Sequence, residues 1–263
     1  MRRTKLIMIA LALLTLVART AQAEMYVEGY TGGNFAASAS DMISGNYRND
    51  PFWGAGPFTT NHSGHIAPAV IAGLKIGTWF VREGFLGYNY PDRMKYFGFY
   101  IDFSYHRLLF RRQSGTWTNP TVPVYYRDNF FSEGNAITLA FMFAVRYGFF
   151  PDHEVPFGRL QPYIAVGPAI LFSSQRPTFY SPNNDWTLKA PTDSTVYPAL
   201  AVEAGLRWMV LKNVSLDASF KYRYAHPSYE FSSVVDYLGT IHEFKFSPTL
   251  SLFSFQVCAA YHF

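Results

Sequence analysis

The sequence is poor in cysteine, in charged residues and in long apolar runs, and each shortage excludes a class of protein. Cys258 is the single cysteine, so no disulfide can form within the chain. Charged residues make up 15% of the chain, against about 25% in ordinary soluble domains. After residue 23 no run of about 20 apolar residues occurs, which excludes a membrane-spanning helix there.

An excess of positive charge is also missing once the first 23 residues are set aside. These residues hold four of the 22 Lys and Arg and none of the 18 Asp and Glu, so residues 24–263 carry 18 charges of each sign. Electrostatics therefore give no reason to expect nucleic acid or an acidic substrate as a partner. We expect no cofactor, and the sequence does not identify an external ligand.

The first 23 residues have the organisation of a secretory signal peptide. They combine a positive start that includes Arg2 and Arg3, an apolar segment at 6–17 that is short for a bilayer, and the small-x-small site Ala21-Gln22-Ala23. We expect cleavage after this site and a mature domain over residues 24–263. An N-terminal membrane anchor is the alternative.

Apolar and polar side chains alternate along most of the mature chain, which is typical of β-strands with two different faces. In the clearest example, Ile137, Leu139 and Phe141 alternate with Thr138 and Ala140. The pattern predicts eight strands, at residues 25–35, 67–80, 96–107, 136–149, 160–172, 197–210, 214–224 and 249–263.

The strands, the secretion signal and an aromatic content of 19% together indicate an all-β fold, a transmembrane antiparallel up-and-down β-barrel with a filled polar lumen. The predicted connections at one end of the barrel are short or intermediate. The predicted connections at the other end are long, and they cover residues 36–66, 108–135, 173–196 and 225–248. An even strand count places both termini on the periplasmic side. An extra hairpin within 36–66 would instead give ten strands.

Several stretches carry a resemblance to known proteins. They are Glu24-Met25-Tyr26-Val27-Glu28-Gly29, residues 160–169, residues 216–224 and the final Tyr261-His262-Phe263. They resemble the small bacterial outer-membrane β-barrel family that includes the OmpA-type transmembrane barrel and the OmpW-like proteins. The resemblance implies an integral outer-membrane protein of a Gram-negative bacterium without a periplasmic peptidoglycan-binding domain.

The same resemblance implies partners and an assembly signal. The alternating aromatics that end at Tyr261 and Phe263 are similar to the terminal strand that the outer-membrane assembly machinery reads. Outer-membrane lipid and lipopolysaccharide are the other expected partners. The role that we expect is structural or surface-binding and not enzymatic, with the long extracellular loops as the functional part.

Charges of both signs fall on the predicted inward face. They are Glu28, Lys75, Asp102, Arg146, Glu203, Arg207, Asp217, Lys221 and Arg223. Eight strands leave an interior only wide enough for side chains, and buried charges must be paired. We therefore expect a packed ion network that plugs the lumen. A selectivity filter or gate is the alternative, and so is a narrow channel for small apolar solutes.

A hydrolase is a further alternative. His226, Ser228 and Glu230 share one parity and are similar to the His-x-Ser pair and nearby acid of the PagL-type lipid A deacylases. That family has Asn after the Ser, and this chain has Tyr229, so an oxyanion donor is lost. We expect a polar strand end and no catalysis.

Two other features lie in the predicted loops. His62-Ser63-Gly64-His65 has metal-like spacing, but no third ligand lies close in sequence, so we expect a solvated loop and no metal. The second feature is a set of aromatic residues in the long loops. A membrane girdle, a recognition surface and the entrance to a small apolar ligand site are the alternatives for it. The set comprises Phe52, Trp53, Phe58, Trp117, Tyr125, Tyr126, Phe130, Phe131, Phe179, Tyr180 and Trp186.

Overall fold

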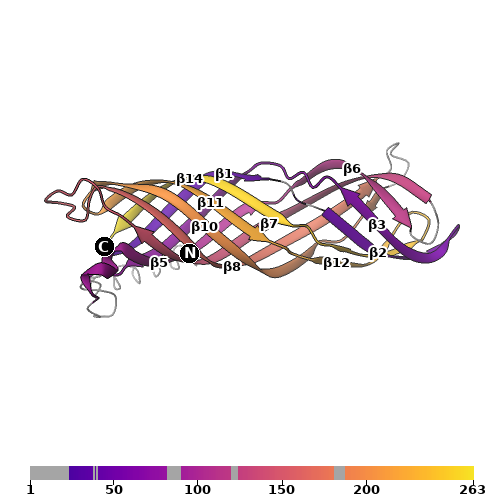
Figure 1. Ribbon diagram of the computed structural model, residues 1–263. Coiled ribbons are helices and arrows are strands. Elements are labelled where there is room, and N and C mark those ends of the chain that lie inside the picture. The colour runs from indigo at the N-terminus through magenta and orange to yellow at the C-terminus, as the bar shows by residue number, and fades with distance from the viewer. Residues whose placement is uncertain (1–23, 38, 40, 82–89, 120–123, 181–186) are drawn as a thin grey trace, which may run out of the picture.

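The computed structural model describes residues 24–37, 39, 41–81, 90–119, 124–180 and 187–263. The predicted signal peptide lies outside the described residues. The strands form one long, narrow cylinder in which they run at a tilt to the long axis (Figure 1). The first and last strands lie side by side in it, because Tyr26 is paired with His262. We call the end that holds these two residues the basal end, and the opposite end the distal end.

Eight antiparallel strands close the barrel at the basal end, as the alternation predicted. They are β1 (Glu24–Ala36), β4 (Ala69–Trp79), β5 (Phe97–Arg107), β7 (Val124–Arg146), β8 (Leu160–Tyr180), β10 (Asp193–Leu211), β11 (Val214–Ala225) and β14 (Leu250–His262). Each pairs with its neighbour in space, β1 closes on β14, and β7 closes on β8. The predicted fold class and strand number are confirmed.

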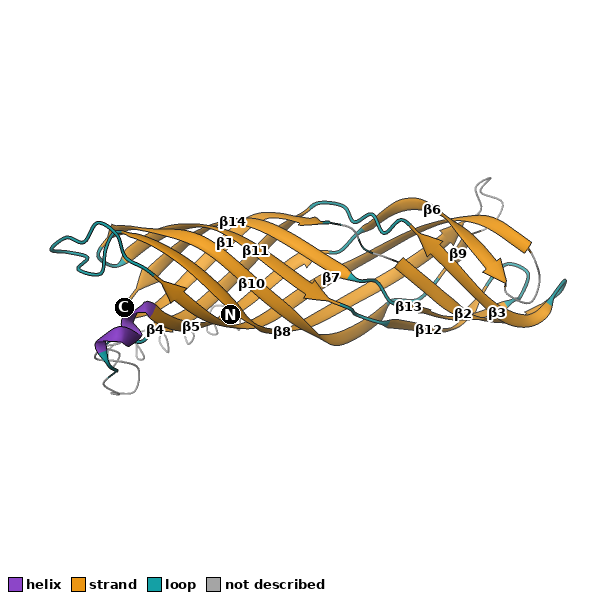
Figure 2. Ribbon diagram, in the orientation of Figure 1, coloured by secondary structure: helices purple, strands orange, loops and turns teal. Residues whose placement is uncertain are grey.

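The four long connections, which the sequence predicted as long loops, are built largely of strands. They carry the shorter strands β2 (Asp41–Asp50), β3 (Gly54–His62), β6 (Phe110–Asn119), β9 (Thr187–Lys189), β12 (Tyr229–Val235) and β13 (Ile241–Phe246). With the distal parts of β7 and β8 these strands continue the wall beyond the eight-stranded barrel (Figure 2). We call this part the distal extension.

Two predictions change because of the distal extension: the boundaries of two barrel strands and the ten-strand alternative. β7 starts at Val124 and not at 136, and β8 ends at Tyr180 and not at 172, because both strands run on into the extension. The hairpin in the first long connection exists as β2 and β3. It pairs with β13 and β6 and does not enter the eight-stranded barrel.

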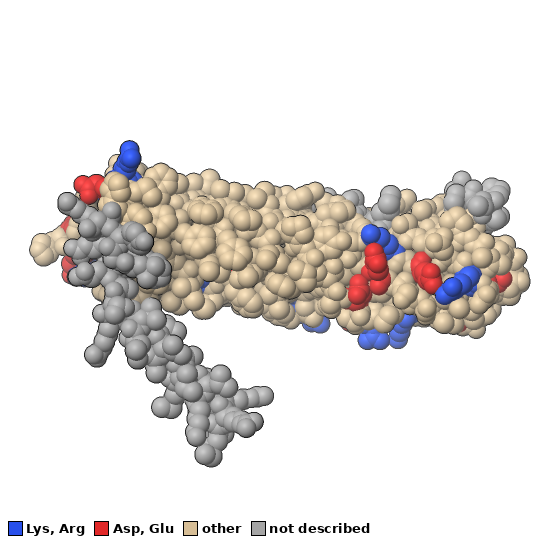
Figure 3. Space-filling model, turned by 90° about the horizontal axis from the view of Figure 1, so that it is seen from below, with Lys and Arg blue, Asp and Glu red and all other residues tan. Residues whose placement is uncertain are grey.

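Alternation along the eight strands separates an apolar outer surface from the interior. On β14, Phe255 and Val257 are 62% and 68% exposed, whereas the neighbouring Gln256 and Cys258 are buried. On β7, Met142 is buried and Phe141 points to the outside. Figure 3 shows a wide band of the surface with almost no charged side chains, between charged groups near the two ends. A band of this kind is typical of a lipid-facing surface.

Short connections lie at the basal end, as predicted. Lys212 and Asn213 form the turn between β10 and β11, and a short 3-10 helix, η2 (Asp92–Tyr96), precedes β5. No helix among the described residues is long and apolar enough to cross a membrane. Between β7 and β8, the Asp152 carboxylate accepts hydrogen bonds from the Glu154 and Val155 amides. These bonds and Arg159 hold the pKa of Asp152 below its ordinary value of 3.8.

Candidate functional site

The barrel interior contains all nine of the predicted inward charges. Each of these side chains is buried: Glu28, Lys75, Asp102, Arg146, Glu203, Arg207, Asp217, Lys221 and Arg223 are at most 4% exposed. Burial at this level requires partners for each charge, because an isolated ion is costly to remove from water.

Lys75 stands at the middle of the network. Its Nζ atom lies 2.6 Å from Glu28 Oε1 and 2.7 Å from Glu203 Oε1. Glu28 lies directly opposite Lys75 on the neighbouring strand, whereas Glu203 reaches it from β10 on another part of the wall. The network therefore spans the lumen as well as following the wall.

The other charges extend this network in both directions. Lys221 pairs with Asp102 and lies 2.9 Å from Glu203 Oε2. Arg207 bridges Glu28 and Asp217, with Nη2–carboxylate distances of 2.7 Å to each. Opposite charges thus alternate through the interior, and each of these cations contacts two carboxylates.

Tyrosine side chains fill the space around the ion pairs. Tyr100 and Tyr163 donate hydrogen bonds to the Glu203 carboxylate at 3.0 and 2.9 Å, and Tyr30 donates to Asp102 at 2.7 Å. Gly73 makes room for one of these rings, since a Cβ at this position would lie 2.3 Å from the Tyr30 ring. The lumen is filled by side chains at this level.

The other two arginines of the set have partners outside this network. Arg146, near the basal end, pairs with Glu24 at 2.6 Å and stacks on Trp79. Arg223 has neutral partners instead and donates to Asn34 Oδ1 at 2.5 Å and to Ser104 at 3.4 Å.

Above the filled lumen, the distal extension contains a partly open cavity of about 510 Å³. A volume of this size lies within the range of small-molecule sites, roughly 300–1,000 Å³. Five of the aromatic residues that the sequence singled out line the cavity, namely Phe52, Trp53, Phe58, Trp117 and Phe179. We call this cavity the distal chamber.

The aromatic rings of the chamber form walls with defined geometry. Trp117 stacks on Phe58 at 5.9 Å and on Trp53 at 6.2 Å between ring centroids. Across the chamber, Phe179 meets Phe244 edge-on at 5.4 Å. These rings come from β3, β6, β8, β13 and the turn between β2 and β3, so the chamber exists only where the long connections fold together.

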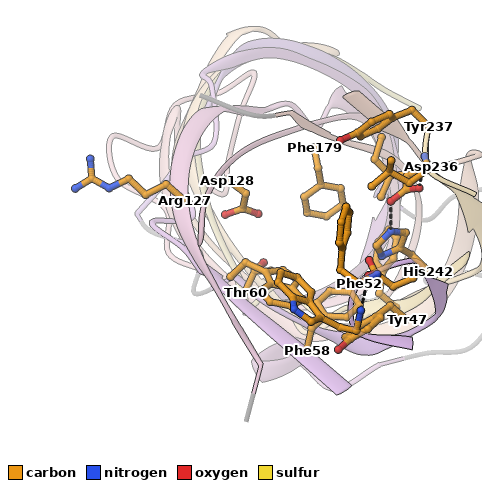
Figure 4. A pocket seen from close by; sticks show the side chains of 16 residues that line it. Tyr47, Phe52, Phe58, Thr60, Arg127, Asp128, Phe179, Asp236, Tyr237 and His242 are labelled. Atoms are coloured by element: carbon orange, nitrogen blue, oxygen red, sulfur yellow. Dashed lines mark hydrogen bonds and ion pairs between the residues drawn. The ribbon is translucent and has the colours of Figure 1, made fainter. Parts of the chain in front are cut away.

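Carboxylates are the second feature of the chamber. Asp128 points into the ring of strands, and Asp236 lies beside His242, with 3.0 Å between Oδ2 and Nε2 (Figure 4). Asp50 lies at the rim and accepts hydrogen bonds from the Phe52 and Trp53 amides. Sequence reasoning missed these groups, because isolated acids in a predicted loop carry no spacing signal.

The remaining aromatic residues of the predicted set have other places. Phe130 is fully buried in the distal extension. The ring centroids of Phe131 and Tyr180 lie 6.2 Å apart. The side chains of Tyr125 and Tyr126 lie outside the described part of the chain, as does Trp186.

The structure does not join the proposed hydrolase residues into one site. His226 is hydrogen-bonded to Thr249 at 3.0 Å, and Ser228 to Ser247 at 2.8 Å. Glu230 is exposed, and its carboxylate lies 3.5 Å from Lys245 Nζ. Each of the three side chains therefore has its own partner.

The two histidines with metal-like spacing lie in different environments. His62 is buried against Phe130, whereas His65 is exposed and binds Gln113 through its backbone amide. Within the described ranges, no group of three or more potential metal ligands occurs.

The terminal aromatics lie on the outer surface at the basal end. Tyr261 and Phe263 are 52% and 37% exposed and contact each other edge-on at 5.2 Å. The amide of Phe263 donates to the Met25 carbonyl at 2.9 Å, which attaches the end of β14 to the start of β1.

Comparison with known proteins agrees with this architecture. The family model described as "Outer membrane protein beta-barrel domain" matches residues 8–263. The chain belongs to this family. It is therefore an integral β-barrel protein of the bacterial outer membrane, and the predicted resemblance to the OmpA-type barrels is confirmed.

One solved structure has a similar fold, and two others have a weaker similarity to the chain. The outer-membrane protein OprG from Pseudomonas aeruginosa is 11% identical over 92% of this chain and 97% of its own, with a TM-score of 0.51. The Neisserial surface protein A and the N-terminal barrel of Pseudomonas aeruginosa OprF are each 12% identical, with TM-scores of 0.34 and 0.33. They cover 91% and 92% of this chain and 97% and 100% of their own. Among curated proteins, no match to this sequence is found.

Proposed function

We propose that this outer-membrane barrel binds a small apolar ligand in its distal chamber and that the chamber faces the outside of the cell. The observation that carries the proposal is the aromatic-lined cavity of about 510 Å³ in the distal extension. A concave, mostly apolar site with a few polar groups is the usual form of a small-molecule site.

The orientation follows from the connections. Outer-membrane barrels have short periplasmic turns and long external segments. The short turns of this chain share the basal end with Tyr26 and His262, so both termini would be periplasmic and the chamber external. The barrel would then serve as the anchor of a surface-binding protein.

The filled lumen argues against the rival proposal of a channel for small apolar solutes. A solute that left the chamber through the barrel would meet paired ions such as Lys75 and Glu203, which are costly to separate. Planar-bilayer recordings test this point. Small and infrequent openings are expected, and a large, steady current would contradict the anchor role.

We also propose that the protein is not an enzyme. The separate partners of His226 and Ser228 support this, since a nucleophile must be within hydrogen-bond reach of its base. Mass spectrometry of lipid A from cells with and without the protein should give the same acylation. Loss of an acyl chain that depends on Ser228 would overturn the proposal.

Lipopolysaccharide and the assembly machinery are the other proposed partners. Arg107, Arg111 and Arg112 are exposed where β5 ends and β6 begins, beyond the apolar band. Guanidinium groups in such positions suit the phosphates of lipid head groups. Tyr261 and Phe263 would be the residues that the assembly machinery reads.

Binding in the chamber is tested with a matched pair of variants. Phe179→Ala removes a ring from the chamber wall, and Phe255→Ala removes one from the lipid face. Titration calorimetry of p-cresol with the protein in lipid nanodiscs should show weaker binding for Phe179→Ala and unchanged binding for Phe255→Ala. Equal affinities for all three proteins, or no binding at all, would contradict the proposed function.

A further inference from the structure

Asp128 differs from the other acidic groups of the distal extension because it has a buried carboxylate oxygen without a hydrogen-bond partner. Its side chain is 5% exposed, and Oδ2 lies 3.3 Å from His62 Nε2. Oδ1 is buried without a hydrogen bond to any described residue. Leaving such an oxygen unsatisfied is costly, so it is a position at which a ligand group would be stabilised.

The direction of this carboxylate matters as much as its burial. Asp128 points into the distal chamber, whereas its neighbour Arg127 points away from it (Figure 4). Arg127 is exposed, which agrees with alternation along β7. The nearest residue of opposite charge along the strand therefore does not neutralise Asp128 from within the chamber.

The other charges of the chamber do not supply a cation for Oδ1. Asp236 accepts hydrogen bonds from the Leu238 and Thr240 amides and lies beside His242. Asp50 caps a turn through the Phe52 and Trp53 amides. These two carboxylates are satisfied by the protein and still add negative potential to the chamber, which disfavours an anion there.

The aromatic walls also favour a cation over an anion. Trp53, Trp117 and Phe58 stack in this order along one side of the chamber. The face of an aromatic ring carries the negative part of its quadrupole and attracts ammonium and guanidinium groups, with Trp the strongest. Rings and carboxylates together therefore favour a ligand that is apolar over most of its surface and positive at one end.

We propose that the ligand of the distal chamber is an organic cation, with an ammonium or amidinium head against Asp128 and an apolar body between the aromatic walls. This inference rests on the proposed function and names the chemical class of the ligand. It does not depend on a metal, since no group of three or more metal-ligating residues occurs in the described part of the chain.

The experiment compares three probes that share one body: 4-phenylbutylamine, 4-phenylbutanol and 4-phenylbutyrate, which are cationic, neutral and anionic at pH 7. Affinities are measured calorimetrically with the full protein in nanodiscs, after subtraction of binding to empty nanodiscs. We expect the amine to bind at least about tenfold more tightly than the alcohol, because a hydrogen bond to a buried charge exceeds a neutral one. The acid should bind least.

A matched pair of variants assigns the preference to one carboxylate. Asp128→Asn keeps the shape and removes the charge, so the ratio of amine to alcohol affinity should fall to near one. Asp92→Asn makes the same change in the exposed η2 helix at the basal end and should leave the ratio as in the unmodified protein. The heat-dependent gel shift of folded barrels shows whether each variant is folded.

The outcomes separate the two proposals. Equal binding of amine and alcohol by the unmodified protein would overturn the cation inference and leave the apolar site standing. A preference for the amine that persists in folded Asp128→Asn would also overturn it. No binding of any probe would contradict the proposed function itself. If Asp128→Asn does not fold, the preference of the unmodified protein decides the question.

Discussion

The lumen of the eight-stranded barrel and the distal chamber are enclosed by one continuous wall of strands, yet their interiors are opposite. Lys75, Glu203 and Lys221 fill the lumen with charges that contact each other. The chamber holds a cavity of about 510 Å³, aromatic walls and a carboxylate oxygen without a partner. The same wall therefore surrounds a core filled by paired charges in one region and a cavity with room for a ligand in the other.

The difference teaches where function resides in such a small barrel. Buried ion pairs demand that every partner be present, and removal of one leaves the others uncompensated. The lumen is therefore committed to its own structure. The chamber has space and an open hydrogen-bonding position, so a ligand can improve its energy.

The largest effect is expected from breaking the charge balance of the lumen. Glu203→Gln leaves Lys75 and Lys221 each with one carboxylate fewer, and loss of a buried ion-pair partner costs about 3–5 kcal/mol. The free energy of unfolding, measured by denaturant titration in lipid vesicles, should fall by this amount. Brief openings in planar bilayers should also become more frequent. Glu243→Gln, which breaks the exposed pair with Arg48 in the distal extension, is the control and should change little.

The second effect concerns which face of β7 meets lipid. Phe141 points outward and Met142 is buried in the lumen. Arginine on the lipid face near the middle of the bilayer costs roughly 2–4 kcal/mol. Phe141→Arg should impair folding into liposomes more than Met142→Gln, because the polar lumen offers the glutamine partners. Equal tolerance of the two changes would refute the assigned faces.

A third, smaller effect tests how tightly the lumen is filled. A methyl group at Gly73 would lie 2.3 Å from the Tyr30 ring, and one at Gly29 would meet no atom within 4 Å. Overpacking a core costs about 1–3 kcal/mol. Gly73→Ala should therefore lower the free energy of unfolding by this amount, and Gly29→Ala should not. A lumen that accepted both changes equally would not be a packed plug.

The smallest effect lies outside both interiors, in the turn between β7 and β8. The Val155 amide and Arg159 lower the pKa of Asp152 below its ordinary value of 3.8. Because the pKa of Asp152 is lower in the folded turn than in the unfolded chain, the ionised carboxylate stabilises the folded turn at pH values above 3.8. This stabilisation is lost as the pH falls through the lower pKa of the folded turn. The amide chemical shift of Val155 should move in NMR spectra below pH 3.8, and Asp152→Asn should abolish that movement. No change in the unmodified protein would contradict the hydrogen bond.

Much of the eight-stranded barrel was predictable because its signal is local. Alternation with a period of two located every barrel strand, and it assigned Glu28, Lys75 and the other seven charges to the interior. Strand ends were predictable where a turn follows, as at Lys212 and Asn213. They were not predictable for β7 and β8, because these strands pass from lipid into the distal extension without a turn.

The distal chamber was only partly predictable. The excess of aromatic residues in the long connections indicated a recognition surface or an apolar ligand site, among other readings. Asp128 and the pair of Asp236 and His242 carried no signal, since they come from two distant parts of the chain and meet only in the folded chamber. The hydrogen-bond partners of His226 and Ser228 likewise required the structure.

The sequence by itself determined the strand number, the lipid-facing surface and the inward position of the charges, because a period of two is fixed by the geometry of each strand. Some pairs, such as Glu28 with Lys75, follow from strand neighbours alone. Only the tertiary structure decided that Lys75 also meets Glu203 and that six short strands build a chamber above the barrel. Closure of the wall brings these groups together, and closure depends on pairings between segments far apart in the chain.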